Sequence, residues 1–156
     1  MLKVVLRNVL EYDIKTAYEV FKPMHDNLSY SDIDSKVEYL RKPRYPDFKS
    51  FKEALEQINI FFIVNENEDR VVGYIILDVL NHGPAYINEI MVEREERKRG
   101  YGKKAIQVLI EGLKEDKDIE VLRVISATMA TDNFYSACNF RYIAGDIYEY
   151  RLKWCK

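Results

Sequence analysis

The residues best suited to chemistry lie in a short loop, Arg97 to Lys103, between an expected strand and an expected helix. Gly100 and Gly102 allow backbone conformations closed to other residues and let a ligand approach the chain closely. The amides at the start of the following helix point outward at the positive end of its dipole, which favours phosphate oxygens. The basic side chains around this point are Arg97, Lys98, Arg99 and Lys103. The loop therefore predicts a site for a ligand that carries a diphosphate.

Two common phosphate-binding loops do not match this segment. A Walker loop requires Gly-Lys followed by Ser or Thr, and that ending is missing. The G-x-G-x-x-G pattern of dinucleotide-binding folds fails at Ala105, and no acidic residue is placed to meet a ribose. The expected ligand is therefore a phosphate compound of another kind.

Composition predicts one soluble domain. The 156 residues are 47% hydrophobic and 32% charged, which suits a single globular domain over residues 1–156. No apolar run is long enough for a membrane span and no export segment is evident, so we expect a cytoplasmic protein without a membrane partner. The net charge of −2 gives no overall field that would hold nucleic acid. Two histidines and two cysteines without metal-ligand spacing predict no metal site.

Hydrophobic periodicity predicts the helices. Asp13 is expected to cap the first helix and Pro23 to end it, and a second helix is expected from Ser31. His25 and His82 are expected to lie in loops, where a chemical role is the less favoured interpretation. Further helices are expected near residues 48–58, 103–113 and 131–138.

Apolar and alternating segments predict the strands. Residues 121–127 are nearly all apolar, so we expect a strand that is buried on both faces and reached by a crossover. The segment from Tyr148 to Trp154 is expected to form an edge strand that could pair two subunits as a homodimer. The other expected strands cover residues 2–6, 60–64, 71–80, 85–92 and one or two segments between 140 and 154. This order predicts an α/β protein with a mixed sheet.

A more specific pattern runs through the strand, the loop and a later helix. The strand Ile87-Asn88-Glu89-Ile90-Met91-Val92, followed by Arg97-x-x-Gly100-x-Gly102, resembles the (Q/R)-x-x-G-x-(G/A) acetyl-CoA motif of the GNAT N-acetyltransferase superfamily. Downstream, Phe134-Tyr135-x-x-x-Asn139-Phe140 is similar to the family's F-Y-x-x-x-G-F. The likeness covers about residues 58–145. It departs from the family at Asn139, which replaces a glycine, and at Thr128 and Thr131, which replace the residues of an N-x-x-A pattern.

The resemblance implies the GNAT fold, a central mixed and mostly antiparallel sheet of six to seven strands flanked by helices. It also implies acetyl-CoA (coenzyme A) as the co-substrate, with no metal. The strand edge at Ile90, Met91 and Val92 would bind the pantetheine arm, and the Ile90 N–H would polarise the thioester carbonyl. The backbone amides at the pyrophosphate would come from Arg97, Lys98, Arg99, Gly100, Tyr101, Gly102 and Lys103.

The resemblance further implies transfer of an acetyl group to a primary amine by direct attack in a ternary complex. Tyr135 matches the position that donates a proton to the coenzyme A sulfur. The position that supplies the base, six residues before Val92, is occupied by Tyr86. Strand alternation favours Tyr86 and Asn88, through a water, over Glu89 as the groups that handle the amine's proton. The faces predicted in this way hold Tyr86, Asn88 and Ile90 on one side and Glu89 and Met91 on the other.

Three functions stay open at the level of the sequence, of which nucleic-acid binding through the basic segment from Arg94 to Lys104 is the least favoured. One is the N-acetyltransferase, with a small-molecule or protein amine as acceptor. Another is a non-catalytic module that binds or senses acyl-CoA. The sequence does not identify the acceptor.

Overall fold

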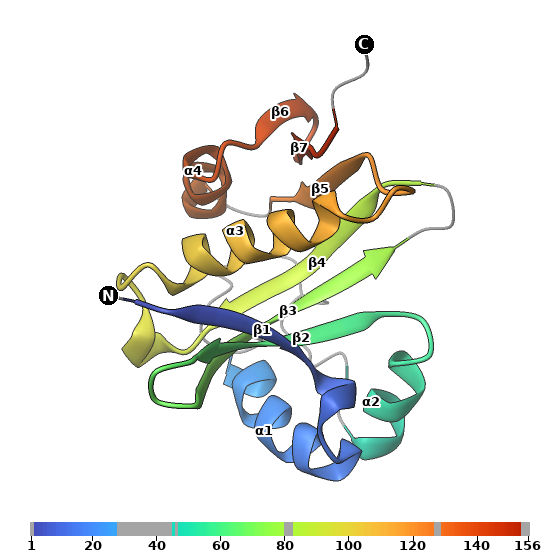
Figure 1. Ribbon diagram of the computed structural model, residues 1–156, viewed down its shortest axis with the longest axis vertical. Helices are drawn as coiled ribbons and strands as arrows, with labels where there is room; N and C mark the ends of the chain where they lie inside the picture. The colour runs from blue at the N-terminus through green and yellow to red at the C-terminus, as the bar shows by residue number, and fades with distance from the viewer. Residues whose placement is uncertain (1, 28–44, 46, 80–82, 127–128, 154–156) are drawn as a thin grey trace.

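The computed structural model describes residues 2–27, 45, 47–79, 83–126 and 129–153, which fold as one layered α/β unit (Figure 1). The expected helix from Ser31 lies outside the described residues, as do His82, Thr128 and Cys155. The strands are β1 (Val4–Asn8), β2 (Asn59–Asn65), β3 (Arg70–Val79), β4 (Ala85–Val92), β5 (Val121–Ile125), β6 (Arg141–Ala144) and β7 (Ile147–Arg151). The helices are α1 (Ile14–Asn27), α2 (Phe48–Ala54), α3 (Tyr101–Lys114) and α4 (Met129–Ala137), with short 3-10 turns η1 (Val9–Glu11) and η4 (Arg94–Glu96).

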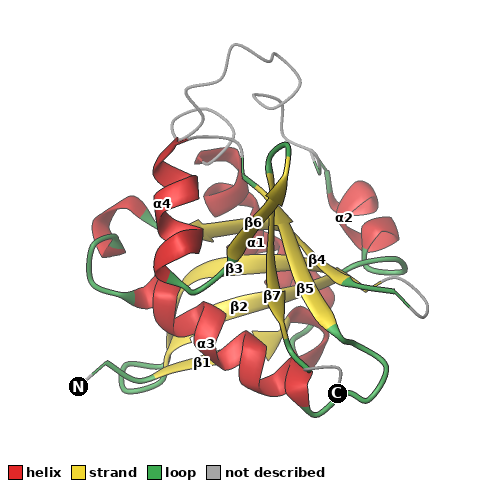
Figure 2. Cartoon of the chain, turned by 90° about the horizontal axis from the view of Figure 1, so that it is seen from above, coloured by secondary structure: helices red, strands yellow, loops and turns green. Residues whose placement is uncertain are grey.

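The strands form one sheet in the order β1-β2-β3-β4-β5-β7-β6. Neighbouring strands are antiparallel except β4 and β5, which are parallel and joined by α3 as a crossover. The predicted mixed and mostly antiparallel sheet is therefore confirmed. Figure 2 shows β5, β7 and β6 running at a steep angle to β1–β3, so the sheet is strongly twisted.

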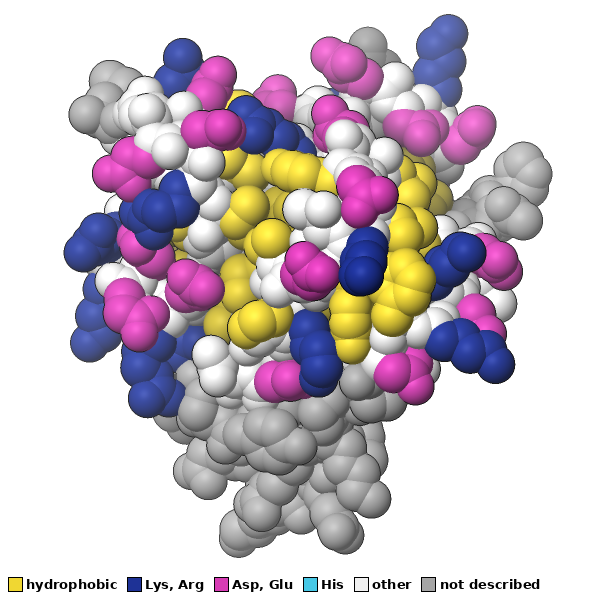
Figure 3. Space-filling model, turned by 90° about the horizontal axis from the view of Figure 1, so that it is seen from below, with side chains coloured by type: hydrophobic (Ala, Val, Ile, Leu, Met, Phe, Trp, Pro, Cys, Tyr) yellow, Lys and Arg dark blue, Asp and Glu magenta, His cyan; other side chains and the backbone are white. Residues whose placement is uncertain are grey.

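The sheet separates two apolar cores. In Figure 1, α3 and α4 lie on one side of β1–β4, and α1 and α2 lie on the other. The α3 core packs residues such as Ile106 and Leu122, and the α1 core packs residues such as Phe21, Phe51 and Tyr74. Seen from the α1 side, positive and negative side chains are interspersed over the surface (Figure 3). This face therefore carries no continuous field of one sign.

The first helix continues past Pro23, so the prediction that this proline ends it is wrong. α1 reaches Asn27 with Pro23 inside it. A proline in a helix lacks the N–H that would bond one turn back. The extra turn buries Met24 and His25, which are 2% and 1% exposed, and this burial offsets the missing hydrogen bond. The assignment of His25 to a loop is wrong for the same reason.

The C-terminal part of the sheet differs from the prediction in two ways. β5 is buried on one face only, because Leu122 and Val124 pack into the α3 core whereas Ile125 is 65% exposed. Among the described residues, the α1 core contains no β5 side chain, so nothing from α1 or α2 covers that face. The chain then reverses near Gly145 and places β7 between β5 and β6. The segment from Tyr148 is therefore an inner strand, and the edge strand is β6.

α4 ends in the conformation that the Asn139 substitution predicts. Asn139 has φ 70°, in the left-handed region that asparagine enters more readily than most residues. The Phe140 N–H donates to the Tyr135 carbonyl and the Asn139 N–H to the Ser136 carbonyl, both at 3.0 Å. These two bonds form a Schellman motif, and the Tyr135 and Phe140 rings, 5.5 Å apart, supply its apolar contact. The motif fixes the position of Tyr135.

Candidate active site

A gap opens between β4 and β5 along the second half of β4. The two strands pair only from Ala85 to Ile87, and no described residue of β5 pairs with β4 beyond Ile87. The Glu93 N–H donates to the Val72 carbonyl of β3 at 2.8 Å, so strand alternation turns the peptide groups of Val92 and Ile90 the other way, into the gap. The Ile90 N–H and carbonyl therefore face the gap, where no described strand pairs with them.

The Val92 carbonyl and the Met91 peptide groups, on the same strand, already have hydrogen-bond partners. The Val92 carbonyl, which faces the gap, accepts a hydrogen bond from Arg97 Nε at 2.8 Å. Met91 directs its peptide groups to β3, and its side chain is 3% exposed within the α1 core. Of the three strand residues expected at the cofactor, Ile90 has the most open backbone.

A bulge in β4 changes which side chains share a face. Ile76 pairs with Glu89 and Leu77 with Ile87, which leaves Asn88 without a partner on β3. Beyond the bulge Glu89 faces the α1 core, and Tyr86, which pairs with Asp78, faces the same side. The prediction that Ile90 shares a face with Tyr86 is therefore wrong, because the one extra residue, Asn88, reverses the alternation beyond it.

Glu89 meets two polar side chains that line the α1 core. The Tyr74 hydroxyl donates to Glu89 Oε2 at 2.5 Å, and His25 Nδ1 lies 3.1 Å from the same oxygen. His25 Nδ1 is also 2.9 Å from the Tyr74 hydroxyl, which closes a three-membered cluster. Tyr74 and His25 are buried, and the Glu89 side chain is 13% exposed. We call these residues the Glu89 cluster.

The sequence analysis missed the Glu89 cluster. A signal was present, because His25 follows Phe21 by four residues and so extends the apolar stripe of the first helix. Because the helix was predicted to end at Pro23, His25 was not included in this stripe.

Tyr86 is engaged with a cation. Arg123 Nη1 lies 3.5 Å from the Tyr86 hydroxyl, and Arg123 Nε donates to Glu149 at 2.7 Å. The hydrogen bond to Tyr86, followed by the one to Glu149, raises the pKa of Arg123. Asn88, the other residue named by the sequence, is exposed at the bulge. Neither residue contacts the Glu89 cluster through any described hydrogen bond.

The loop before α3 presents an open helix start. Lys98 and Gly100 have φ 64° and 92°, and Gly100 is the N-cap without a side-chain hydrogen bond. Such left-handed residues turn successive amides toward one side. The Lys104 N–H donates to the Gly100 carbonyl at 3.0 Å, so the amides of Tyr101 to Lys103 precede the helical ladder. This geometry fits an anion at the end of a 14-residue helix.

The side chains of the loop divide into exposed basic groups and groups with structural contacts. Lys98 and Arg99 are exposed, and Arg99 Nη1 is 3.3 Å from Glu96. Arg70 pairs with the other oxygen of Glu96 and holds the pKa of that carboxyl below its usual range. The Tyr101 ring is buried, and its hydroxyl accepts from Asn65 Nδ2 at 2.7 Å. Tyr101 can therefore offer a ligand its amide but not its ring.

The two loop glycines have different structural roles. A Cβ added at Gly100 would meet only a Leu2 methyl at 3.8 Å, so glycine there serves the positive φ. A Cβ added at Gly102 would lie 3.2 Å from two ring atoms of Phe134. Gly102 therefore lets α4 approach the first turn of α3.

Tyr135 is buried in the α3 core next to that contact. Its ring lies 5.1 Å from Phe134 and 5.5 Å from Phe140. Burial, and secondarily the Cys138 thiol, raises the pKa of Tyr135 well above its usual range. The phenol therefore stays protonated at any working pH.

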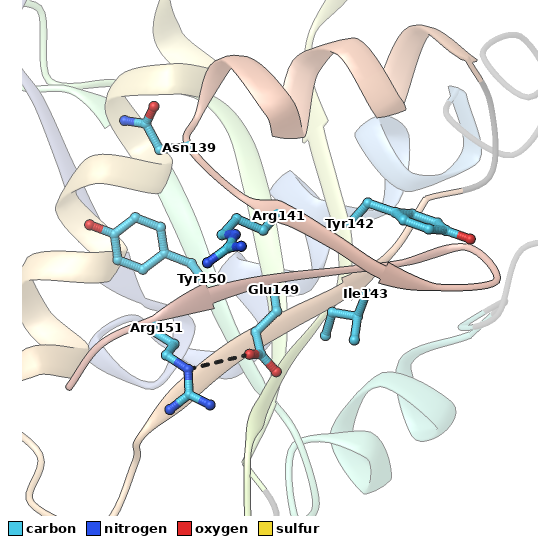
Figure 4. A pocket seen from close by; sticks show the side chains of 7 residues that line it. All are labelled: Asn139, Arg141, Tyr142, Ile143, Glu149, Tyr150 and Arg151. Carbon is cyan, nitrogen blue, oxygen red and sulfur yellow. Dashed lines mark ion pairs between the residues drawn. The ribbon is translucent and has the colours of Figure 1, made fainter. Parts of the chain in front are cut away.

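Two hollows near the C-terminal strands share Asn139 and Tyr150 in their lining. One of about 390 Å³ begins at Lys103 and follows α3 to Cys138 and Asn139. The other, of about 470 Å³, is open, and its lining belongs to the β6–β7 hairpin and Asn139, with Arg151 paired to Glu149 (Figure 4). This second hollow includes no residue of the α3 loop or of the β4 gap. Of these two hollows, only the first includes Lys103, in the first turn of α3.

Within the described ranges, no helix is long and apolar enough to cross a membrane. In the same part of the chain, no group of three or more His, Cys, Asp and Glu side chains is placed to hold a metal ion.

Solved structures of other proteins share this fold. The acetyltransferase of the GNAT family from Staphylococcus aureus Mu50 superposes with a TM-score of 0.71 at 19% identity, covering 98% of this chain and 100% of that one. The PaiA N-acetyltransferase from Thermoplasma acidophilum, in complex with coenzyme A, gives 0.67 at 18% identity, with 96% and 99% covered. A spermidine N-acetyltransferase variant from Vibrio cholerae gives 0.69 at 13% identity, with 96% and 94% covered. No curated protein matches the sequence.

At these identities the structural likenesses show the fold alone. The family model described as the acetyltransferase (GNAT) family matches residues 25–140, most of the chain, and includes the β4 gap, the α3 loop and Tyr135. The chain belongs to the GNAT acetyltransferase family.

Proposed function

We propose that this protein transfers the acetyl group of acetyl-CoA to a primary amine. One observation carries the proposal: a single strand-loop-helix unit presents both an unpaired strand edge at Ile90 and an uncapped helix start after Gly100. Acetyl-CoA has matching parts, since an amide-bearing arm can pair with a strand edge and a diphosphate suits a helix start. An N-acetyltransferase is thus the function this geometry supports best.

The chain's own groups would bind acetyl-CoA in three places. Backbone amides from Lys98 to Lys103 would hold the pyrophosphate, with the exposed Lys98 and Arg99 adding charge. The Ile90 peptide would pair with the pantetheine arm. The hollow beside Lys103 has room for the nucleotide end. Arg97 would act indirectly, because its guanidinium holds the end of β4.

The reaction requires two hydrogen-bond donors besides the attacking amine, one for the thioester oxygen and one for the sulfur. The Ile90 N–H would donate to the thioester oxygen as negative charge develops on it. Tyr135 would donate a hydrogen bond to the departing sulfur. Since a thiol has a pKa of about 8.5 and burial raises that of Tyr135, the phenol can give up its proton only while it gains one from the attacking nitrogen. We therefore propose that Tyr135 passes a proton from nitrogen to sulfur.

A thiol-release assay tests the proposal. Wild-type protein is mixed with acetyl-CoA and a panel of amines: polyamines, amino acids and peptides with free N-termini. Spermidine belongs in the panel because one structural neighbour is a spermidine N-acetyltransferase. Thiol release with at least one amine is expected. Tight binding of acetyl-CoA without release from any amine would instead favour the non-catalytic acyl-CoA-binding module.

Two charge-reversal variants test where acetyl-CoA binds. Arg99→Glu places a negative charge beside the proposed pyrophosphate, on a side chain that is 62% exposed and so tolerates the change. We expect the Kd for acetyl-CoA to rise by about 10-fold, equivalent to about 1.4 kcal/mol. Lys49→Glu, on α2 and 84% exposed, is the matched control and should leave the Kd unchanged. Equal effects of the two variants would place the cofactor elsewhere.

A further inference from the structure

The Glu89 cluster lies where the proposed reaction needs a proton acceptor. Glu89 directly precedes Ile90, whose N–H faces the gap, and its side chain points to the α1 side of β4. Oε2 of Glu89 takes both polar contacts, from Tyr74 and His25. No hydrogen bond or ion pair among the described residues involves Oε1, and the side chain keeps 13% exposure. One oxygen is thus held in place while the other remains open to a ligand.

A stabilising role does not account for this arrangement. A carboxylate in an apolar core has to be desolvated, and neutral apolar side chains would usually serve stability as well or better. Two polar groups that meet one oxygen, and that also contact each other, instead fix the direction of the other oxygen. Such positioning is what a catalytic base requires.

We propose that Glu89 is the catalytic base that accepts the proton of the acceptor's ammonium group, with His25 and Tyr74 as positioning residues. This inference rests on the proposed acetyl transfer. Tyr86 is less suited because its hydroxyl already contacts Arg123. Asn88 is less suited because an amide accepts hydrogen bonds but does not take up a proton near neutrality.

The proton balance of the step is as follows. The ammonium gives one proton to Glu89 Oε1, which becomes a carboxylic acid, and the freed nitrogen lone pair attacks the thioester carbon. A C–N bond forms, and the carbonyl π electrons move to oxygen beside the Ile90 N–H. When the carbonyl re-forms, the C–S bond breaks and its electrons leave on sulfur. The nitrogen's second proton reaches the sulfur through Tyr135, and Glu89 later releases its proton to solvent. One net proton is released per amide formed.

An amine series with Glu89→Gln tests the base. The substitution keeps the side chain's shape, and Glu53→Gln on the exposed face of α2 is the matched control. With a strongly basic alkylamine we expect kcat/KM to fall by about 100-fold or more, the range of general-base effects. With a hydrazide or aromatic amine, which is uncharged at neutral pH, we expect a loss below about 3-fold by the same principle. The Kd for acetyl-CoA should not change in either variant.

Several outcomes would overturn the assignment. A Glu89→Gln protein with full activity toward the alkylamine, or with equal losses for both amine classes, would show that Glu89 takes no proton. A wild type that releases no thiol with any amine would instead refute the proposed function, and the base with it.

A separate variant tests whether Tyr74 positions Glu89. Tyr74→Phe keeps the ring in the α1 core and removes the hydroxyl, which donates to Glu89 at 2.5 Å and lies 2.9 Å from His25 Nδ1. We expect a smaller loss of kcat/KM than in Glu89→Gln, again confined to the basic amine. A merely structural role would lower the activity toward both amine classes alike and would contradict the assignment.

Discussion

The contact between α3 and α4 can be measured with two glycines of one helix. Gly102 and Gly112 both lie in α3, and they receive the same substitution to alanine. A Cβ at Gly112 meets nothing within 4 Å, whereas a Cβ at Gly102 meets two Phe134 ring atoms at 3.2 Å. The pair therefore separates the effect of helix propensity from the effect of crowding.

The structure predicts a difference in stability between the two variants. Gly112→Ala gains helix propensity without a new contact, which should raise the free energy of unfolding by about 0.5–1 kcal/mol. Gly102→Ala forces Phe134 to give way by a few tenths of an ångström, and such overpacking costs about 1 kcal/mol or more. In a chain of this length, 1 kcal/mol moves the melting temperature by roughly 2–4 °C.

Urea and thermal unfolding of wild type, Gly112→Ala and Gly102→Ala provide the measurement. We expect the midpoint of Gly112→Ala to lie above those of wild type and Gly102→Ala, with unchanged m-values. If Gly102→Ala were stabilised as much as Gly112→Ala, Phe134 would not lie against the first turn of α3, and our explanation of the second loop glycine would fail.

Three further predictions concern single residues. Arg70 lowers the pKa of Glu96, which contributes stability that is present above the carboxyl's unfolded pKa and lost as pH falls through the folded pKa. Urea midpoints should therefore drop more between pH 5 and pH 3 in wild type than in Glu96→Gln. Parallel curves for the two proteins would contradict this. Asn139 has a φ of 70°, so Asn139→Ala should lower the free energy of unfolding by about 1 kcal/mol, whereas Asn139→Gly should not. Denaturant unfolding measures both variants, and equal losses would refute the left-handed cap. Tyr135→Phe should lower kcat by about 10-fold or more with an unchanged Kd for acetyl-CoA, and a thiol-release assay that finds full kcat would remove Tyr135 from the mechanism.

The parts of the fold that follow local patterns were predictable from the sequence. β4 was expected at 85–92 and is found at Ala85–Val92, because alternating apolar residues end at a charged loop. The helix after Gly100 follows from its apolar stripe. The left-handed Asn139 follows from the one substitution in the F-Y-x-x-x-G-F pattern.

The features that were not predictable depend on contacts far apart in the chain. The bulge at Asn88 arises from the register of β4 against β3, which periodicity within β4 cannot reveal. The turn beyond Pro23 exists because Met24 and His25 are buried against the α1 core, and tertiary burial outweighs a local helix breaker. Together these two departures brought His25 to Glu89 and changed the candidate base.

Amide NMR spectra during an acetyl-CoA titration would test the central claim most directly. The account predicts that the largest shifts fall on the backbone amides from Lys98 to Lys103 and on Ile90, which are the groups that the open helix start and the β4 gap present. Shifts that cluster at the β6–β7 hairpin, or that spare the α3 loop, would contradict it.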